Sequence, residues 1–316
     1  MIISDFRSAV GPLSGPGLVV VDVNDGTGTS CSPKVYPGVA DRNRSGWSSW
    51  WARDRLLRTS GRRRDRRTNR SEGSVTPSIP VLSTVSVGLG PTGVAIAPDG
   101  GRLYVANSGS GTVSVVDVAS GSTAATITVE RDPQGLAITP DGRRAYVTHA
   151  GLGLVSVIDT DSNVVTGTIA VSEFPSEVAI TPDGRRAYVA RALADQLTII
   201  DTATDSVTGS SDRLETGALV GVAISPDGRR AYVLPEGTCL ALVLDTATNT
   251  QVPGPPILIG CAAADVAFTP DGRHALSTSS SLGEQAELYV VDTATQKAHN
   301  PVLIGDSAYG ITGVSS

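Results

Sequence analysis

Short apolar runs separated by turn residues repeat along most of the chain. In one unit the fourth run alternates the apolar residues Val165, Ile169 and Val171 with small or polar neighbours, which predicts a strand with one polar face. That face indicates the outermost strand of a sheet, and the short apolar run at the other end of the unit indicates the innermost strand. The four predicted strands are GLAIT (135–139), RRAYVTH (143–149), LVSVID (154–159) and VVTGTIAV (164–171).

A PDG turn follows the first predicted strand of each unit. Pro fixes φ, Asp accepts hydrogen bonds from nearby backbone, and Gly adopts the strained conformation. The turn aspartates recur every 42 to 44 residues, at Asp99, Asp141, Asp183, Asp227 and Asp271. A second series ends the third strand, at Asp117, Asp159, Asp201, Asp245 and Asp292. Because both series recur in every unit, we interpret them as turn formers. A period of this length is typical of a four-stranded blade, so the sequence predicts an all-β propeller.

The first unit, PTGVAIAPDGGRLYVANSGSGTVSVVDVASG (91–121), and its four successors resemble the YVTN-type β-propeller repeat family. The resemblance covers residues 81–316. It implies blades of four antiparallel strands, most often seven in number. It also implies links to cell-surface proteins and to binding roles, and kinship with lactonases and with propellers that carry cofactors. The resemblance is therefore more specific for fold than for function.

The two ends of the chain each contain part of a further unit. Five regular units occupy 81–306, and 307–316 begins another unit with a single strand. Residues 1–30 contain GLVVVDVNDG, which matches a third strand and its turn, so we expect them to complete that closing blade. Asp22 ends this strand, and Asp117 ends the corresponding strand of the first regular unit. The two aspartates are 95 residues apart, which is about two periods. A degenerate blade is therefore expected in 31–80.

These counts predict seven blades in a single domain that spans 1–316. We expect the N- and C-terminal strands to close the ring, with 17–23 paired to 307–314 in one sheet. Closure of this kind removes unpaired sheet edges, because each end of the chain supplies the strands that the other lacks.

Charge is distributed unevenly along the chain. The net charge is −6, but 41–70 contains eleven Arg and three Asp, so this segment has a charge of +8 and the remaining residues have −14. All three Trp lie in the same segment. A basic segment with interleaved Trp can bind nucleic acid or an anionic surface. The alternatives for 41–67 are a degenerate blade with a solvated loop or a stretch read out of frame. Nucleic acid is not the expected partner, because the acidic remainder would repel phosphate.

One position near the start of the innermost strand differs between units. It is glycine in most units but an acid in two, which gives Gly93, Gly135, Glu177, Gly221, Asp265 and Gly310 in chain order. Residues that depart from a structural repeat are candidates for function. We therefore expect Glu177 and Asp265 to lie at the mouth of the central channel and to bind a cationic or hydroxyl-rich ligand.

The loop between the second and third strands is predicted on the same face as these acids. It brings Asn107, His149, Arg191 and Glu236, and loops on one face of a rigid scaffold often carry function. Glu177, Asp265, Asn107 and Glu236 are the ligand-binding candidates. His149, Arg191 and Glu177 are the catalytic candidates. The alternative for all of them is that they are ordinary solvated loop residues.

Metal and cofactor chemistry is not expected. The three His residues do not have the spacing of metal ligands, and the sequence contains neither a phosphate-binding glycine loop nor a nucleophile elbow. We therefore predict no metal and no cofactor. Cys239 and Cys261 could meet across neighbouring strands, either as free thiols or as a disulfide.

The function predicted from these features is a monomeric binding or scaffold protein for an unknown protein or small-molecule ligand, without catalysis. The alternative is a cofactor-independent, lactonase-like hydrolase or a lyase, and a second alternative is binding through 41–70. No apolar run is long enough to span a bilayer, and the start of the chain does not resemble an export signal. These features predict a cytoplasmic location. Export or display at the cell surface, as in many propellers of this type, is the alternative.

Overall fold

The computed structural model describes residues 2–4, 21–24, 83–172, 174–261, 263–279, 286–305 and 310–312. All of them belong to one of the two units into which the chain divides by its internal contacts. The other unit, 31–76, lies outside the described residues, and so do the basic segment 41–70 and the whole of the predicted degenerate blade 31–80.

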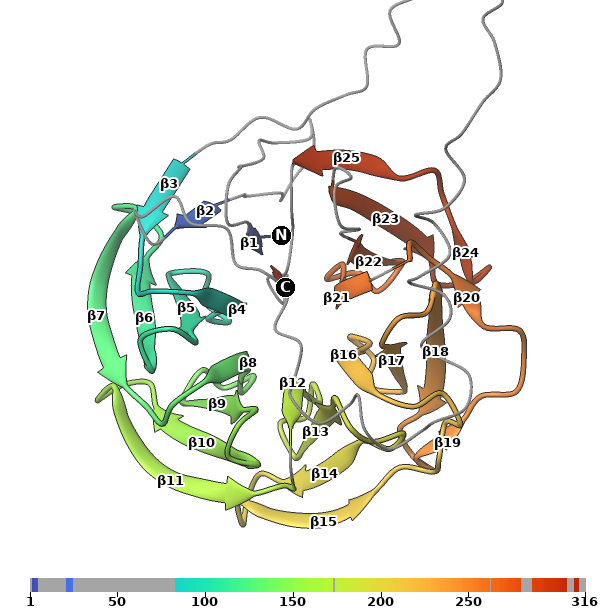
Figure 1. Ribbon diagram of the computed structural model, residues 1–316, viewed down its shortest axis with the longest axis horizontal. Helices are drawn as coiled ribbons and strands as arrows, with labels where there is room; N and C mark the ends of the chain where they lie inside the picture. The colour runs from blue at the N-terminus through green and yellow to red at the C-terminus, as the bar shows by residue number, and fades with distance from the viewer. Residues whose placement is uncertain are drawn as a thin grey trace, which may run out of the picture. The chain divides into compact units, whose positions relative to one another are not determined.

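Five antiparallel blades of four strand positions surround a centre (Figure 1). The first consists of β4 (Pro91–Ile96), β5 (Arg102–Asn107), β6 (Thr112–Asp117) and β7 (Ser122–Thr128). The second consists of β8 (Pro133–Ile138), β9 (Arg144–His149), β10 (Leu154–Asp159) and β11 (Val164–Ala170). The third consists of β12 (Pro175–Ile180), β13 (Arg186–Arg191), β14 (Thr198–Asp201) and β15 (Ser206–Ser210). The all-β propeller is therefore confirmed.

The outer strand is divided in the last two blades. The fourth blade consists of β16 (Leu219–Ile224), β17 (Arg230–Pro235), β18 (Leu240–Asp245) and β19 (Thr250–Gln251), with β20 (Ile257–Leu258) also paired to β18. The fifth consists of β21 (Ala263–Phe268), β22 (His274–Ser279), β23 (Ala286–Asp292) and β24 (Lys297–Ala298), with β25 (Val302–Gly305) also paired to β23. In both blades the residues between the two outer pieces include proline, which cannot donate a ladder hydrogen bond.

The prediction of seven blades is wrong, because the described residues form five. Between the fifth and first blades, β26 (Gly310–Thr312) contacts the innermost strands β21 and β4 and pairs antiparallel with β1 (Ile2–Ser4). Next to them, β2 (Val21–Asn24) pairs in parallel with β3 (Ser83–Ser86). The chain ends therefore meet, but β26 pairs with β1 rather than with the predicted 17–23. The count of seven assumed that two repeat lengths must hold an additional blade, and spacing alone does not show that residues form strands.

The PDG turns are built as the sequence predicted. In the second blade the Gly142 N–H donates to the Thr139 carbonyl at 2.8 Å, and Gly142 adopts a φ of +73°. The Asp141 Oδ1 accepts the Thr139 hydroxyl at 2.5 Å and the Arg143 N–H at 3.1 Å. These hydrogen bonds, above all the one from Thr139, lower the pKa of Asp141. The ionised carboxylate therefore stabilises the turn.

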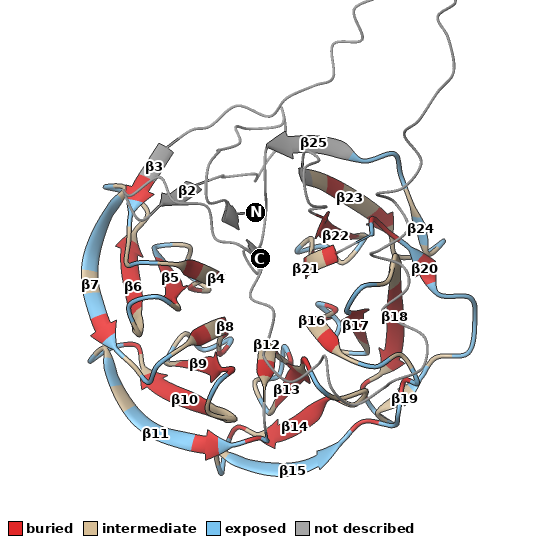
Figure 2. Ribbon diagram, in the orientation of Figure 1, coloured by how far each residue is buried: buried red, intermediate tan, exposed pale blue. Residues whose placement is uncertain are grey.

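The core lies between neighbouring blades, and the outer strands face solvent (Figure 2). Positions that recur in the repeat also link one blade to the next through polar groups. The buried Tyr146 donates its hydroxyl proton to Asp205 of the third blade at 2.5 Å, and Arg144 forms an ion pair with the same carboxylate at 3.2 Å. One blade further along, Tyr188 donates to Asn249 at 2.6 Å. Packing and these bonds hold neighbouring blades together around the central channel.

Candidate functional site

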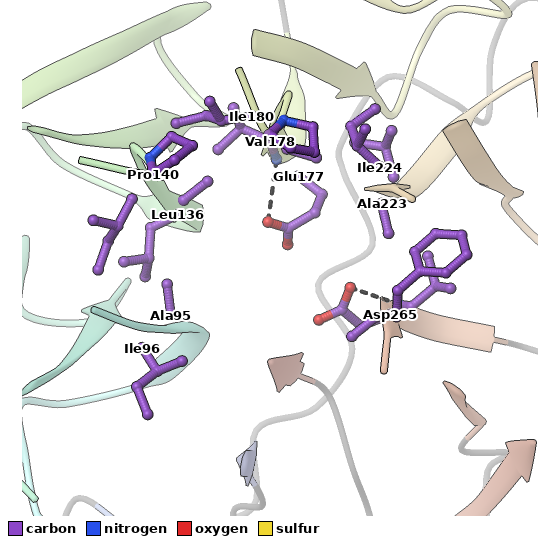
Figure 3. Close-up of a pocket in the computed structure, with 18 of the residues that line it drawn as sticks. Ala95, Ile96, Leu136, Pro140, Glu177, Val178, Ile180, Ala223, Ile224 and Asp265 are labelled. Carbon is purple, nitrogen blue, oxygen red and sulfur yellow. Dashed lines mark hydrogen bonds between the residues drawn. The ribbon is translucent and has the colours of Figure 1, made fainter. Parts of the chain in front are cut away.

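A cavity of about 510 Å³ lies in the channel and is lined by the innermost strands of all five blades (Figure 3). Volumes of this size are typical of sites for small molecules. Among the described residues, the lining is almost entirely aliphatic, aromatic or proline. Glu177 and Asp265 are the two charged residues of this lining.

Glu177 and Asp265 have the same local geometry in two different blades. Each is the third residue of its strand, β12 or β21. The Glu177 Oε1 accepts the Val178 N–H at 3.1 Å, and the Asp265 Oδ1 accepts the Val266 N–H at 2.7 Å. Figure 3 shows both carboxylates directed into the space between the blades. The structure therefore brings together the two acids that replace the repeat glycine.

Burial makes ionisation of Glu177 unfavourable. The surrounding protein raises its pKa well above the ordinary value of 4.5, and the charge of Asp265 raises it further. The hydrogen bond from the Val178 N–H acts in the opposite direction but is weaker. Asp265 is only 8% exposed. Because each negative charge disfavours the other, this pair can retain a proton or accept a positively charged group.

The glycines at the same position show why acids are unusual there. A Cβ on Gly93 would lie 2.3 Å from the Gln134 carbonyl oxygen of the second blade. A Cβ on Gly135 would lie 2.5 Å from the Glu177 Oε1. The Glu177 carboxylate therefore occupies space that glycine leaves open in the preceding blade.

Two of the predicted loop residues, Asn107 and His149, are fully buried. The Asn107 Nδ2 donates to Ser114 at 3.0 Å, and the His149 Nε2 lies 2.9 Å from the Ser156 hydroxyl oxygen, which is the equivalent contact one blade later. Burial lowers the pKa of His149, which favours the neutral ring. Neither residue is among the cavity-lining residues, so in this structure both act in packing between the second and third strands.

Arg191 and Glu236 also lie outside the cavity lining. Arg191 ends β13 and is partly buried, and burial lowers its pKa while the nearby Asp195 opposes that change. Glu236 is exposed and follows Pro235, which is the actual counterpart of Arg191 in the fourth blade. Arg191 is not among the charged groups that shift the pKa of Glu177.

The prolines of the PDG turns also form part of the cavity wall, a role that we did not predict for them. Pro140, Pro182 and their three counterparts line it, as does Phe268 at the end of β21. Phe268 packs edge-on against Tyr232 with ring centroids 4.8 Å apart. The signal was present in the sequence, because a residue that directly follows each innermost strand must also lie near the channel.

Cys239 and Cys261 form a disulfide, with their Cα atoms 3.9 Å apart. The bond connects the start of β18 to the segment that leads into β21. Of the two states that the sequence left open, the structure contains the disulfide. In the part of the chain that the structure describes, no group of three or more His, Cys, Asp or Glu residues could hold a metal ion. The same residues include no helix with the length and apolar character that crossing a membrane requires.

Comparison with known proteins supports the architecture. No family model matches the chain, and no curated protein matches it. Among solved structures, the hydrazine synthase of Kuenenia stuttgartiensis matches with a TM-score of 0.57 and 27% sequence identity. The chain has a β-propeller fold. The match covers 65% of this chain and 63% of that one, so this chain spans less than two thirds of its relative. In all, 1605 solved chains match, and a fold shared so widely does not identify an activity.

Proposed function

We propose that this protein is a binding protein whose small-molecule ligand occupies the central cavity. The observation that carries the proposal is the replacement of the repeat glycine by Glu177 and Asp265, whose carboxylates face the same central cavity. Placing two acids in such a space reduces stability unless another group compensates. Residues retained at that cost are typical of a functional site.

A binding role is favoured over the hydrolase or lyase alternative. An acid–base mechanism needs groups that converge on one reacting atom. The candidates His149 and Arg191 do not line the cavity, and His149 has both ring nitrogens within hydrogen-bond distance of protein oxygens. The name of the hydrazine synthase relative describes that protein's activity, and the partial match gives no reason to assign it here.

We also infer kinship with the YVTN-type propellers. The repeated PDG turn, the Tyr of the second strand and the Asp that ends the third strand support this assignment. In the structure these residues form the turns and the links between blades. The kinship is consistent with a binding role. The repeated residues form the scaffold, so the residues that line the channel can differ from blade to blade and contact a ligand.

A thermal-shift screen tests the proposed function. The probes are n-hexylammonium chloride, glucose, γ-butyrolactone and calcium chloride, each at millimolar concentration. At least one probe is expected to raise the melting temperature of the wild type by about 2 °C or more, because a ligand of the folded state stabilises it. The double variant Glu177→Gln/Asp265→Asn is expected to lose that shift.

The matched control is Glu130→Gln/Asp161→Asn, which removes the same two charges from exposed positions. It should respond to the probes as the wild type does. A probe that stabilises the wild type and the cavity variant equally would contradict a ligand site at these acids. So would a screen in which no probe shifts the wild type.

A further inference from the structure

We propose that the disulfide between Cys239 and Cys261 is a redox-sensitive clasp that joins the fourth blade to the fifth and keeps β21 in place at the cavity. Part of this inference rests on the proposed function, because β21 carries Asp265 and the clasp thereby regulates the binding site. Cys239 lies just before β18 in the fourth blade, and Cys261 lies shortly before β21 in the fifth (Figure 1).

The junctions between the first four blades share a polar link. The arginine that begins the second strand of each blade donates a hydrogen bond to a carbonyl oxygen of the next blade. These bonds run from Arg102 to Thr160 at 3.2 Å, from Arg144 to Thr202 at 2.6 Å and from Arg186 to Thr246 at 2.7 Å. A hydrogen bond from a charged donor is stronger than one between neutral groups, so the link stabilises each of these junctions.

Among the described residues, the junction between the fourth and fifth blades lacks this link. Arg230 is the counterpart of those arginines, but it forms an ion pair with Asp245 of its own blade at 2.9 Å. Tyr232 contacts the fifth blade through its ring, which packs edge-on against Phe268. The disulfide lies at the opposite end of β18 from Asp245. It therefore provides a covalent link at a junction that the arginine does not cross.

The outer strand of the fourth blade gives a second reason for the clasp. In the second blade β11 pairs with β10 along its whole length. In the fourth blade β20 pairs with β18 through two residues, and the Ile259 N–H donates to the Cys239 carbonyl oxygen at 2.9 Å. Few ladder bonds hold the segment that leads to Cys261, and segments with few such bonds open most readily. The disulfide therefore restrains this segment.

The clasp is connected to the cavity through a short stretch of chain. Cys261 is four residues before Asp265. Its carbonyl oxygen accepts the hydroxyl proton of Ser279 at the end of β22, at 2.5 Å. Cys261 is thus held to the fourth blade by its sulfur and to the fifth by its carbonyl. Reduction removes the first of these contacts, so the start of β21 can shift and change the position of Asp265 in the cavity.

A thiol reductant can reach the bond, because Cys261 is exposed and Cys239 is partly buried. The reductant's thiolate attacks the Cys261 sulfur, which forms a mixed disulfide and releases Cys239 as a thiolate that takes up a proton. A second thiol of the reductant then displaces Cys261 as a thiol. The reductant loses two electrons and becomes a disulfide, and the protein gains two thiols.

The test compares the oxidised and the reduced whole chain, with Cys31→Ser in every sample so that the thiols come from this pair. In millimolar dithiothreitol, amides of β18, β20 and β21 should exchange hydrogen at least about tenfold faster by mass spectrometry, because a disulfide contributes more than one power of ten to stability. Amides of the second blade, whose arginine links remain, should not change. The carboxyl ¹³C resonance of Asp265 should shift. Cys239→Ser/Cys261→Ser should match the reduced protein and not respond to dithiothreitol.

Four outcomes would contradict the proposal. Unchanged exchange after reduction would show that the bond does not hold the junction. Equal acceleration in the second blade would make the disulfide a staple of the whole fold. Faster exchange without a shift of the Asp265 resonance would overturn the connection to the cavity, and a bond that dithiothreitol leaves intact would overturn redox sensitivity. The reduced chain carries the test if the double variant does not fold. Neither measurement uses a ligand, so failure here is distinct from failure of the probe screen.

Discussion

Glu177 and Gly135 occupy equivalent positions on the innermost strands of neighbouring blades and lie next to each other. The carboxylate of one blade lies where a side chain of the preceding blade would otherwise be, 2.5 Å from the position of a Cβ on Gly135. Glycine at 135 therefore positions Glu177 in the cavity. The glycine does so by sterics alone, because its φ is not in the left-handed region.

The variant Gly135→Ala tests this pairing. The new methyl group should displace the flexible end of Glu177, with a loss of about 1 kcal/mol in the free energy of unfolding and a several-fold loss of affinity for the probe that stabilises the wild type. Gly167→Ala on the outer strand β11 is the control, because a Cβ there meets nothing within 4 Å. Urea unfolding and calorimetry measure both effects. Unchanged binding in Gly135→Ala would show that the glycine does not position Glu177.

At the scale of elements, the PDG turn connects each innermost strand to the second strand of its blade. The turns of the first and second blades differ at two positions, where Thr139 and Arg143 replace Ala97 and Gly101. Thr139 gives the Asp141 carboxylate a second donor in addition to the Arg143 N–H. In the first blade that position is Ala97, so Asp99 accepts only the Gly101 N–H, at 2.9 Å. The carboxylates of Asp141 and Asp99 thus differ by one accepted hydrogen bond, the one from the Thr139 hydroxyl.

Replacing each turn aspartate by alanine should reveal that difference. Asp141→Ala is expected to lower the free energy of unfolding by about 1–2 kcal/mol, and Asp99→Ala by about 0.5–1 kcal/mol, because a hydrogen bond of this kind contributes about 0.5–1.5 kcal/mol. Both residues are exposed, so packing changes little in either variant. Urea denaturation at pH 7 provides the comparison. Equal losses would indicate that the Thr139 hydroxyl does not stabilise its turn.

At the scale of the whole molecule, the sequence predicts the blades because one period of apolar runs and turns repeats in register five times. The predicted number of blades was wrong, since the count of seven included residues without a clear strand pattern. Comparison of the repeats also pointed to Glu177 and Asp265, which the structure places at the cavity. The same comparison could not show that Asn107 and His149 are buried, because the direction of a side chain at a strand end depends on packing against the next strand.

The central claim is that Glu177 and Asp265 interact as a pair in the central cavity. A side-chain carboxyl NMR titration of Glu177 tests it most directly. We expect the pKa of Glu177 to lie above 4.5 and to fall when Asp265→Asn removes the neighbouring charge. Titration of Glu177 at its ordinary pKa, unchanged by Asp265→Asn, would contradict the account.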